Sequence, residues 1–175
     1  MNRYVLFIVC ASLLIGIAAC GSQREMTSPP ATSSVDTSNL YFVAAYDPNR
    51  DPFADQAAAI EQAKQSGRYV LLEIGGDWCV WCHILEDYIA SNEDIATAMQ
   101  ANFVIVKVNV SEENQNDAFM AQYPQVAGYP HFYILDDEGK LLQSQNTGEL
   151  EQGDSYNHDV FLSFVNKWSP KKPSE

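Results

Sequence analysis

Two cysteines three residues apart, Cys79 and Cys82, constrain the fold more than any other feature of the chain. Residues 69–74 before them form a short apolar run that is typical of a buried strand. Gly-Gly-Asp at 75–77 ends that run, and the spacing after it predicts a helix over 79–89. Cys79 would then begin the helix, and Cys82 would follow one turn later on the same face, where their sulfurs can join.

This placement gives the two thiols different chemistry. Free N–H groups and the positive end of the helix dipole point at the first sulfur. Both stabilise a thiolate and lower its pKa from the usual value of about 8.5. We therefore expect Cys79 to be the attacking thiol and Cys82 to resolve the mixed disulfide that forms.

The rest of the chain alternates helical and strand patterns. Helices are expected over residues 55–66, 92–99, 116–123 and 159–168, and strands over 103–110, 131–135 and 141–144. Acidic residues and a glycine between the last two strands predict a hairpin. Residues 146–157 are expected to be a solvated loop. This order implies an α/β fold whose central mixed β-sheet is flanked by helices on both faces.

The N-terminus has the pattern of an export signal. Arg3 precedes a nearly apolar run over residues 4–19, which is shorter than the roughly 20 residues of a membrane span. The Ile-Ala-Ala-Cys sequence that ends at Cys20 resembles the lipobox of bacterial lipoproteins. That resemblance implies a signal peptide at 1–19 and diacylation of Cys20, with an uncleaved membrane anchor as the alternative.

Four segments follow from this interpretation: the signal peptide 1–19, a lipidated flexible tether 20–39, a folded domain 40–170 and a tail 171–175. Both interpretations of the N-terminus place the domain in the cell envelope, facing the periplasm. Gly21 stands where enteric lipoproteins retained at the inner membrane carry aspartate, which favours the outer membrane.

The cysteine count and the net charge argue against two classes of protein: one stabilised by a disulfide framework and one that binds nucleic acid. Cys10 leaves with the signal and Cys20 is lipidated, so Cys79 and Cys82 are the remaining thiols, and a stabilising disulfide framework is ruled out. A net charge of −13, with no basic stripe, disfavours a nucleic-acid partner. The acidity is interpreted as a solvated surface.

Two charged residues interrupt strands of buried type. Glu73 and Lys107 lie within apolar runs, where charges are rarely buried unless they are paired. Either each lies at an exposed strand end, or the two pair beneath the dithiol. In the second case, a desolvated carboxylate with a raised pKa could take the proton from Cys82.

The segment from Glu73 to Cys82 resembles the active-site strand and helix of thioredoxins. An acidic residue six positions before the first cysteine, Glu73, and a Trp immediately before it, Trp78, match that family. Lys107 matches the buried-site lysine of thioredoxins, and Val-Ala-Gly-Tyr-Pro at 126–130 matches their cis-proline loop. The resemblance implies a thioredoxin fold, a cis Pro130 against the disulfide, and substrate contacts through Trp78, Tyr129 and Pro130.

The resemblance also implies thiol–disulfide exchange, with Cys79, Cys82, Glu73 and Lys107 as catalytic residues. We expect a reductase of protein or small-molecule disulfides, without a cofactor or metal. In an oxidising compartment it would need a membrane dithiol as electron donor. Val-Trp replaces the Gly-Pro found between the cysteines of thioredoxin, which leaves the reduction potential open. His83 after the second cysteine points to an extended thioredoxin-like branch.

Three alternatives stay open. Cys-Val-Trp-Cys-His is also the attachment pattern of c-type haem, with a second axial ligand from Met99, Met120, His131 or His158. Two thiolates with His83 or His131 could instead hold zinc or copper. The domain could also be a non-catalytic thioredoxin-like module.

Overall fold

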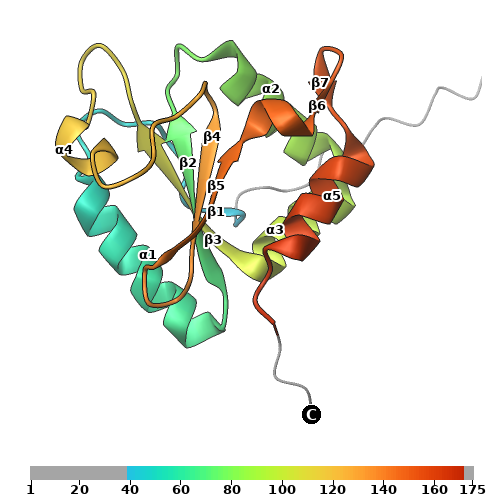
Figure 1. The fold of residues 1–175 in the computed structure, drawn as a ribbon, viewed down its shortest axis with the longest axis horizontal. Helices are drawn as coiled ribbons and strands as arrows, with labels where there is room; N and C mark the ends of the chain where they lie inside the picture. Colours follow the sequence, from blue (N-terminus) through green and yellow to red (C-terminus); the bar gives the residue numbers. More distant parts are fainter. Residues whose placement is uncertain (1–38, 172–175) are drawn as a thin grey trace, which may run out of the picture. The chain divides into compact units, whose positions relative to one another are not determined.

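The computed structural model describes residues 39–171 (Figure 1). The predicted signal peptide, Cys20 and nearly all of the tether and tail lie outside the described residues. The elements in chain order are β1 Tyr41–Val43, α1 Pro52–Ser66, β2 Tyr69–Gly75, α2 Val80–Ser91, α3 Glu93–Asn102, β3 Phe103–Asn109, α4 Asp117–Met120, β4 His131–Leu135, β5 Leu141–Asn146, the 3-10 helix η1 Thr147–Leu150, β6 Glu151–Gln152, β7 Ser155–Tyr156 and α5 His158–Lys167. Within 39–171, no helix is long and apolar enough to cross a membrane.

Five strands form the central sheet in the order β1-β3-β2-β4-β5. β3 pairs in parallel with both β1 and β2, whereas β4 runs antiparallel to β2 and to β5. The predicted mixed sheet is therefore confirmed. β2 is its central strand and is buried along nearly its whole length, so the Gly75 end of β2 lies inside the molecule.

Strand alternation divides the core into two layers. Val70 and Leu72 of β2 pack with Ala59 and Ala63 of α1 on one face of the sheet. Leu71 belongs to the opposite layer, with apolar side chains of α2, α3 and α5. Helices thus cover both faces, as predicted (Figure 1). By the same alternation, Glu73 and Lys107 point to the face that α2 covers.

Two segments differ from the sequence prediction. The helix expected over 116–123 is one short turn, because Asn116 adopts a left-handed φ of 50° before it and Pro124 disfavours helix beyond it. The predicted loop 146–157 folds into η1 and the β6–β7 hairpin. Tyr156 of this hairpin is buried and packs edge-to-face on Trp81, so the segment covers part of α2.

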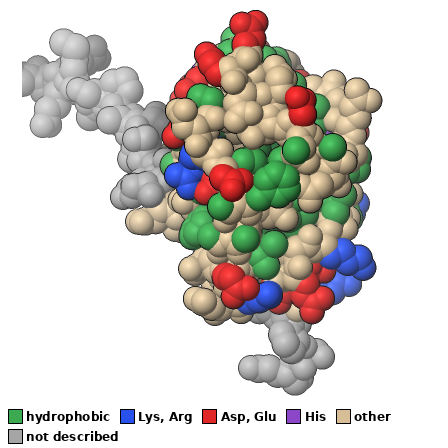
Figure 2. Space-filling view, turned by 90° about the vertical axis from the view of Figure 1, so that its left-hand side faces the viewer, with side chains coloured by type: hydrophobic (Ala, Val, Ile, Leu, Met, Phe, Trp, Pro, Cys, Tyr) green, Lys and Arg blue, Asp and Glu red, His purple; other side chains and the backbone are tan. Residues whose placement is uncertain are grey.

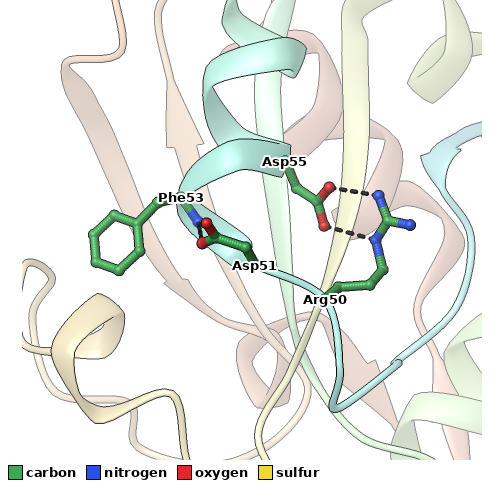
Figure 3. A network of polar contacts seen from close by, with 4 residues as sticks. All are labelled: Arg50, Asp51, Phe53 and Asp55. Atoms are coloured by element: carbon green, nitrogen blue, oxygen red, sulfur yellow. Dashed lines mark hydrogen bonds and ion pairs between the residues drawn. The ribbon is translucent and has the colours of Figure 1, made fainter.

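The start of α1 is fixed by side chains on both sides of its first residue (Figure 3). Asp51 caps the helix by accepting a hydrogen bond from the Phe53 N–H at 3.0 Å. Arg50 donates two hydrogen bonds to the carboxylate of Asp55, at 2.7 and 2.5 Å. The chain between β1 and α1 is therefore held firmly at its helical end.

Figure 2 shows the face that carries α1 and α4. Hydrophobic side chains lie near its centre, and acidic side chains are spread over it rather than gathered in one block. Phe53 of α1 is 46% exposed and packs edge-to-face on Phe119 of α4. The scattered acidic groups on this face fit the interpretation of the negative charge as a solvated surface.

A substitution of Phe161 in α5 tests the packing of the core layer on the face of the sheet that α2 covers. Phe161 is fully buried against Tyr88, Phe132 and Tyr156. Phe161→Ala should lower the free energy of unfolding by about 3–5 kcal/mol, because it leaves a cavity. Urea denaturation measures the change. Val160→Ala, at an exposed position of the same helix, should shift it by less than about 0.5 kcal/mol; equal losses in both variants would contradict this packing.

Candidate active site

The two cysteines form a disulfide at the end of the central strand. β2 ends at Gly75, α2 begins at Val80, and Cys79 is the N-cap residue of α2. The Cys79 sulfur accepts a hydrogen bond from the Cys82 N–H at 3.2 Å. No acidic residue lies in the first turn of α2 to oppose a thiolate. The predicted strand–break–helix arrangement is confirmed.

Two glycines allow the chain to approach the disulfide closely. A Cβ atom on Gly75 would lie 2.6 Å from the Cys82 sulfur, and one on Gly76 would lie 2.5 Å from Nε1 of Trp78. Neither place has room for a side chain, so the Gly-Gly break has a steric reason beyond ending the strand.

Two of the predicted substrate residues, Trp78 and Tyr129, lie together beside the disulfide, and Pro130 follows Tyr129 in the chain. The Tyr129-Pro130 bond is cis, as expected. Tyr129 packs on the cysteines and edge-to-face on Trp78, whose Nε1 donates to the Val110 carbonyl at 2.8 Å. Trp78 is 57% exposed. A pocket of about 440 Å³ opens here, lined by Trp78, Val110, Ser111, Glu112, Glu113, Gln115 and Tyr129.

Glu73 is fully buried beside Tyr46, which forms one apolar cluster with both cysteines. Its Oε1 accepts a hydrogen bond from the Tyr46 hydroxyl at 2.5 Å, and its Oε2 has no hydrogen-bond partner. Burial raises the pKa of Glu73 above its ordinary value, and the positive charge of Lys107 and the Tyr46 hydrogen bond only partly oppose this. The alternative of an exposed strand end is therefore wrong for Glu73.

Lys107 is also buried, but its ion pair is not the expected one. Glu73 and Lys107 are register partners on β2 and β3, yet the Lys107 ammonium binds Oε1 of Glu86 on α2 at 3.0 Å. It also lies over the rings of Tyr41 and Tyr46, 4.5 and 5.2 Å from their centroids. The predicted direct pair is thus replaced by Lys107–Glu86, because α2 brings a second carboxylate over β3.

Two residues of this network, Glu86 and Tyr46, have no part in the sequence prediction. Glu86 could have been found, since it follows Cys82 by one helical turn and shares its face. Tyr46 could not, because it lies in an irregular segment far from the cysteines in sequence. His83, in contrast, is exposed and bonds only the Asp77 carbonyl, at 2.8 Å from Nε2.

Two of the histidines considered as ligands lie at different places in the fold. His131 is buried beside Ser144, and burial lowers its pKa to about 4. His158, at the start of α5, pairs with Asp94. Within residues 39–171, no three His, Cys, Asp or Glu side chains are grouped so that they could hold a metal ion.

Comparisons with known proteins place this chain in a family. A family model described as Thioredoxin-like matches residues 51–137. The disulfide bond reductase DsbH of Chlamydia pneumoniae is 26% identical over 147 residues, which cover 78% of this chain and 80% of DsbH. A thiol:disulfide interchange protein DsbD of Pseudomonas is 25% identical, but this chain spans only 27% of its length.

Solved structures share the fold. The disulphide isomerase of Xylella fastidiosa is 23% identical, with a TM-score of 0.59 over 72% of this chain and 97% of the isomerase. The C-terminal domain of Neisseria meningitidis DsbD is 19% identical, with a TM-score of 0.52 over 71% of this chain and 99% of that domain. The sheet, the buried dithiol and these likenesses agree: the chain belongs to the thioredoxin-like superfamily and has thiol–disulfide oxidoreductases as its relatives there.

Proposed function

We propose that this protein reduces disulfides outside the cytoplasm through the Cys79–Cys82 dithiol. The observation that carries the proposal is the disulfide at the N-terminus of α2, beside the exposed Trp78 and beside Tyr129, the residue that precedes the cis Pro130. An open pocket there can accept a segment of a substrate beside the sulfurs. The reductase direction is supported by the likeness to DsbH along four-fifths of its length.

The proposed reaction has two exchange steps. The Cys79 thiolate attacks a substrate disulfide, forms a mixed disulfide and releases the first substrate thiolate. The Cys82 thiol then loses its proton toward Glu73 and attacks the Cys79 sulfur. The disulfide shown by the structure forms again, the second substrate thiolate leaves, and two electrons have passed to the substrate. Lys107 holds Glu86 and lowers the electrostatic cost of a charged Glu73.

The compartment and the partners are part of the proposal. We infer that Cys20 carries the lipid and that residues 20–39 tether the domain in the envelope. We also infer that the protein is anchored in the outer membrane. The substrates are protein or small-molecule disulfides, and a membrane dithiol returns the electrons. The likeness to DsbD and DsbH supports this extracytoplasmic circuit.

The main rival is haem attachment at the same cysteines. It would require the sulfurs of Cys79 and Cys82, residues that are 4% and 1% exposed, to leave the core and bond the porphyrin. The absorption spectrum of the protein from a host able to mature c-type cytochromes distinguishes the two. A Soret band that survives denaturation would refute the dithiol proposal.

Serine variants of the two cysteines test the exchange steps. Cys79→Ser should reduce turnover of glutathione disulfide to the uncatalysed rate, because the attacking thiolate is gone. Cys82→Ser should accumulate a mixed disulfide on Cys79, because nothing resolves it. Mass spectrometry without reductant measures both. Retained turnover in Cys79→Ser, with Cys82→Ser forming no adduct, would show that other groups carry the activity.

Glu73 should make stability depend on pH. The folded protein binds a proton on Glu73 more tightly than the unfolded chain does, because burial raises its pKa above 4.5. The contribution of Glu73 to the free energy of unfolding is therefore largest below that value and falls as pH rises through the raised pKa, by up to about 1.4 kcal/mol per pH unit. Glu73→Gln should remove this fall and be more stable than wild type at about pH 8, measured by urea denaturation.

The exposed Glu61→Gln is the matched control for the pH series and should keep the wild-type curve. If Glu73→Gln has the same pH dependence as Glu61→Gln, the carboxyl of Glu73 does not titrate differently on folding.

Lipid attachment at Cys20 is tested in cells of a Gram-negative host. Cys20→Ser should lose the acyl chains and move the protein from the membrane to the soluble fraction, because two chains are needed for stable anchoring. Mass spectrometry of the N-terminal peptide measures the lipid. Cys10→Ser, within the signal, should stay lipidated; an unlipidated wild type would refute the lipoprotein proposal.

A further inference from the structure

Tyr46 lies between β1 and α1, yet its side chain reaches the active site. It is 6% exposed and forms one apolar cluster with Cys79 and Cys82. Its hydroxyl donates to Oε1 of Glu73 at 2.5 Å. Nothing in packing requires a hydroxyl at this place, since a phenylalanine ring would fill the same space. The hydroxyl therefore calls for a chemical explanation.

The position of Gly75 shows how close the hydroxyl and the sulfur are. A Cβ atom built on Gly75 would lie 2.6 Å from the Cys82 sulfur and 2.9 Å from the Tyr46 oxygen. The two atoms can be no further apart than the sum of those distances. The hydroxyl thus bonds the buried carboxylate on one side and lies close to the resolving sulfur on the other.

We propose that Tyr46 relays the proton of Cys82 to Glu73 when the mixed disulfide is resolved. This inference rests on the thiol–disulfide exchange proposed above and adds a third residue to it. The Tyr46 O–H already points at the carboxylate, so the lone pairs of the same oxygen remain free to accept a proton from the Cys82 thiol.

The transfer balances without any further reactant. The Cys82 S–H bond breaks and its proton goes to the Tyr46 oxygen, while the Tyr46 proton moves to Oε1 of Glu73. The Cys82 sulfur attacks the Cys79 sulfur, and the bond from Cys79 to the substrate sulfur breaks. The electron pair leaves with the substrate thiolate. Tyr46 ends as it began, a neutral phenol.

The groups around Tyr46 favour a neutral relay over a charged one. Glu73 and Glu86 are acidic, and Tyr41 is a second buried phenol, while the Lys107 ammonium lies 5.2 Å from the Tyr46 ring centroid. Burial and the two carboxylates raise the pKa of Tyr46 well above its ordinary value. A tyrosinate is therefore costly here, and Tyr46 must accept one proton as it gives up another.

The backbone around Tyr46 is held in place at several points. The Arg50 N–H donates to the Asp47 carbonyl at 3.2 Å, and the Asn114 side chain donates to the Pro48 carbonyl at 2.8 Å. The Arg50–Asp55 pair fixes the end of the segment at α1 (Figure 3). The hydroxyl is thus positioned from a part of the chain that is independent of α2.

The test follows one turnover of the reduced protein with glutathione disulfide, by acid quench and mass spectrometry. Tyr46→Phe should form the Cys79–glutathione adduct at the wild-type rate. Its conversion to the Cys79–Cys82 disulfide should be at least about tenfold slower and should rise more steeply with pH, because hydroxide must replace the relay. The double variant with Glu73→Gln should be no slower than Glu73→Gln alone, since both residues serve one path.

Tyr41→Phe is the matched control. Its hydroxyl is buried without a hydrogen-bond partner beside the same lysine, so both steps should keep wild-type rates. A wild-type second step and pH profile in Tyr46→Phe, or effects of Tyr46→Phe and Glu73→Gln that multiply, would overturn the relay. If the wild type forms no adduct at all, the proposed function fails instead.

Discussion

The buried carboxyl of Glu73 is the constraint on which the site depends. A carboxylate without water is costly unless hydrogen bonds and charges compensate it, and here one oxygen has a single partner while the other has none. The Lys107 ammonium could have neutralised it fully, but that ammonium is shared with Glu86. The result is a carboxyl that holds its proton more tightly than an exposed one. A proton acceptor of this kind is suited to a thiol, whose own pKa is higher.

Sequence patterns predicted most of the frame around this group. The strand before Cys79, the helix after it and the mixed sheet follow from apolar periodicity and the Gly-Gly break. The cis Pro130 followed from a resemblance, because no local rule distinguishes it from the more frequent trans form. The apolar runs around Glu73 and Lys107 also indicated strands of buried type, and a pair beneath the dithiol was one of the two alternatives that they left open. The strand, the helix and the sheet could be predicted because local sequence determines them, and the cis proline could be predicted because its motif is long enough to be specific.

Three of the failures have one physical cause, which is that partners distant in sequence decide them, whereas the shortened helix over 116–123 has a local cause. The Lys107 ammonium had two carboxylates within reach, and only the packing of α2 over β3 selects Glu86. Residues 146–157 are polar enough to resemble a loop, yet Leu150 and Tyr156 bury themselves and order a hairpin against α2. Tyr46 lies in an irregular segment with no periodicity at all. Tertiary contacts of this kind leave no mark in a single sequence.

The charge count of the network explains why a neutral residue suits the place between sulfur and carboxylate. Glu73, Glu86 and Lys107 together carry one negative charge when both carboxyls are ionised. A thiolate formed on Cys82 would add a second negative charge to a site of low dielectric, where like charges repel strongly. If the proton passes to Glu73 at the same moment, the total charge does not change. A phenol that donates one proton as it accepts another allows this transfer between a Cys82 sulfur and a Glu73 carboxylate that are not in direct contact. The phenol itself adds no charge at any stage.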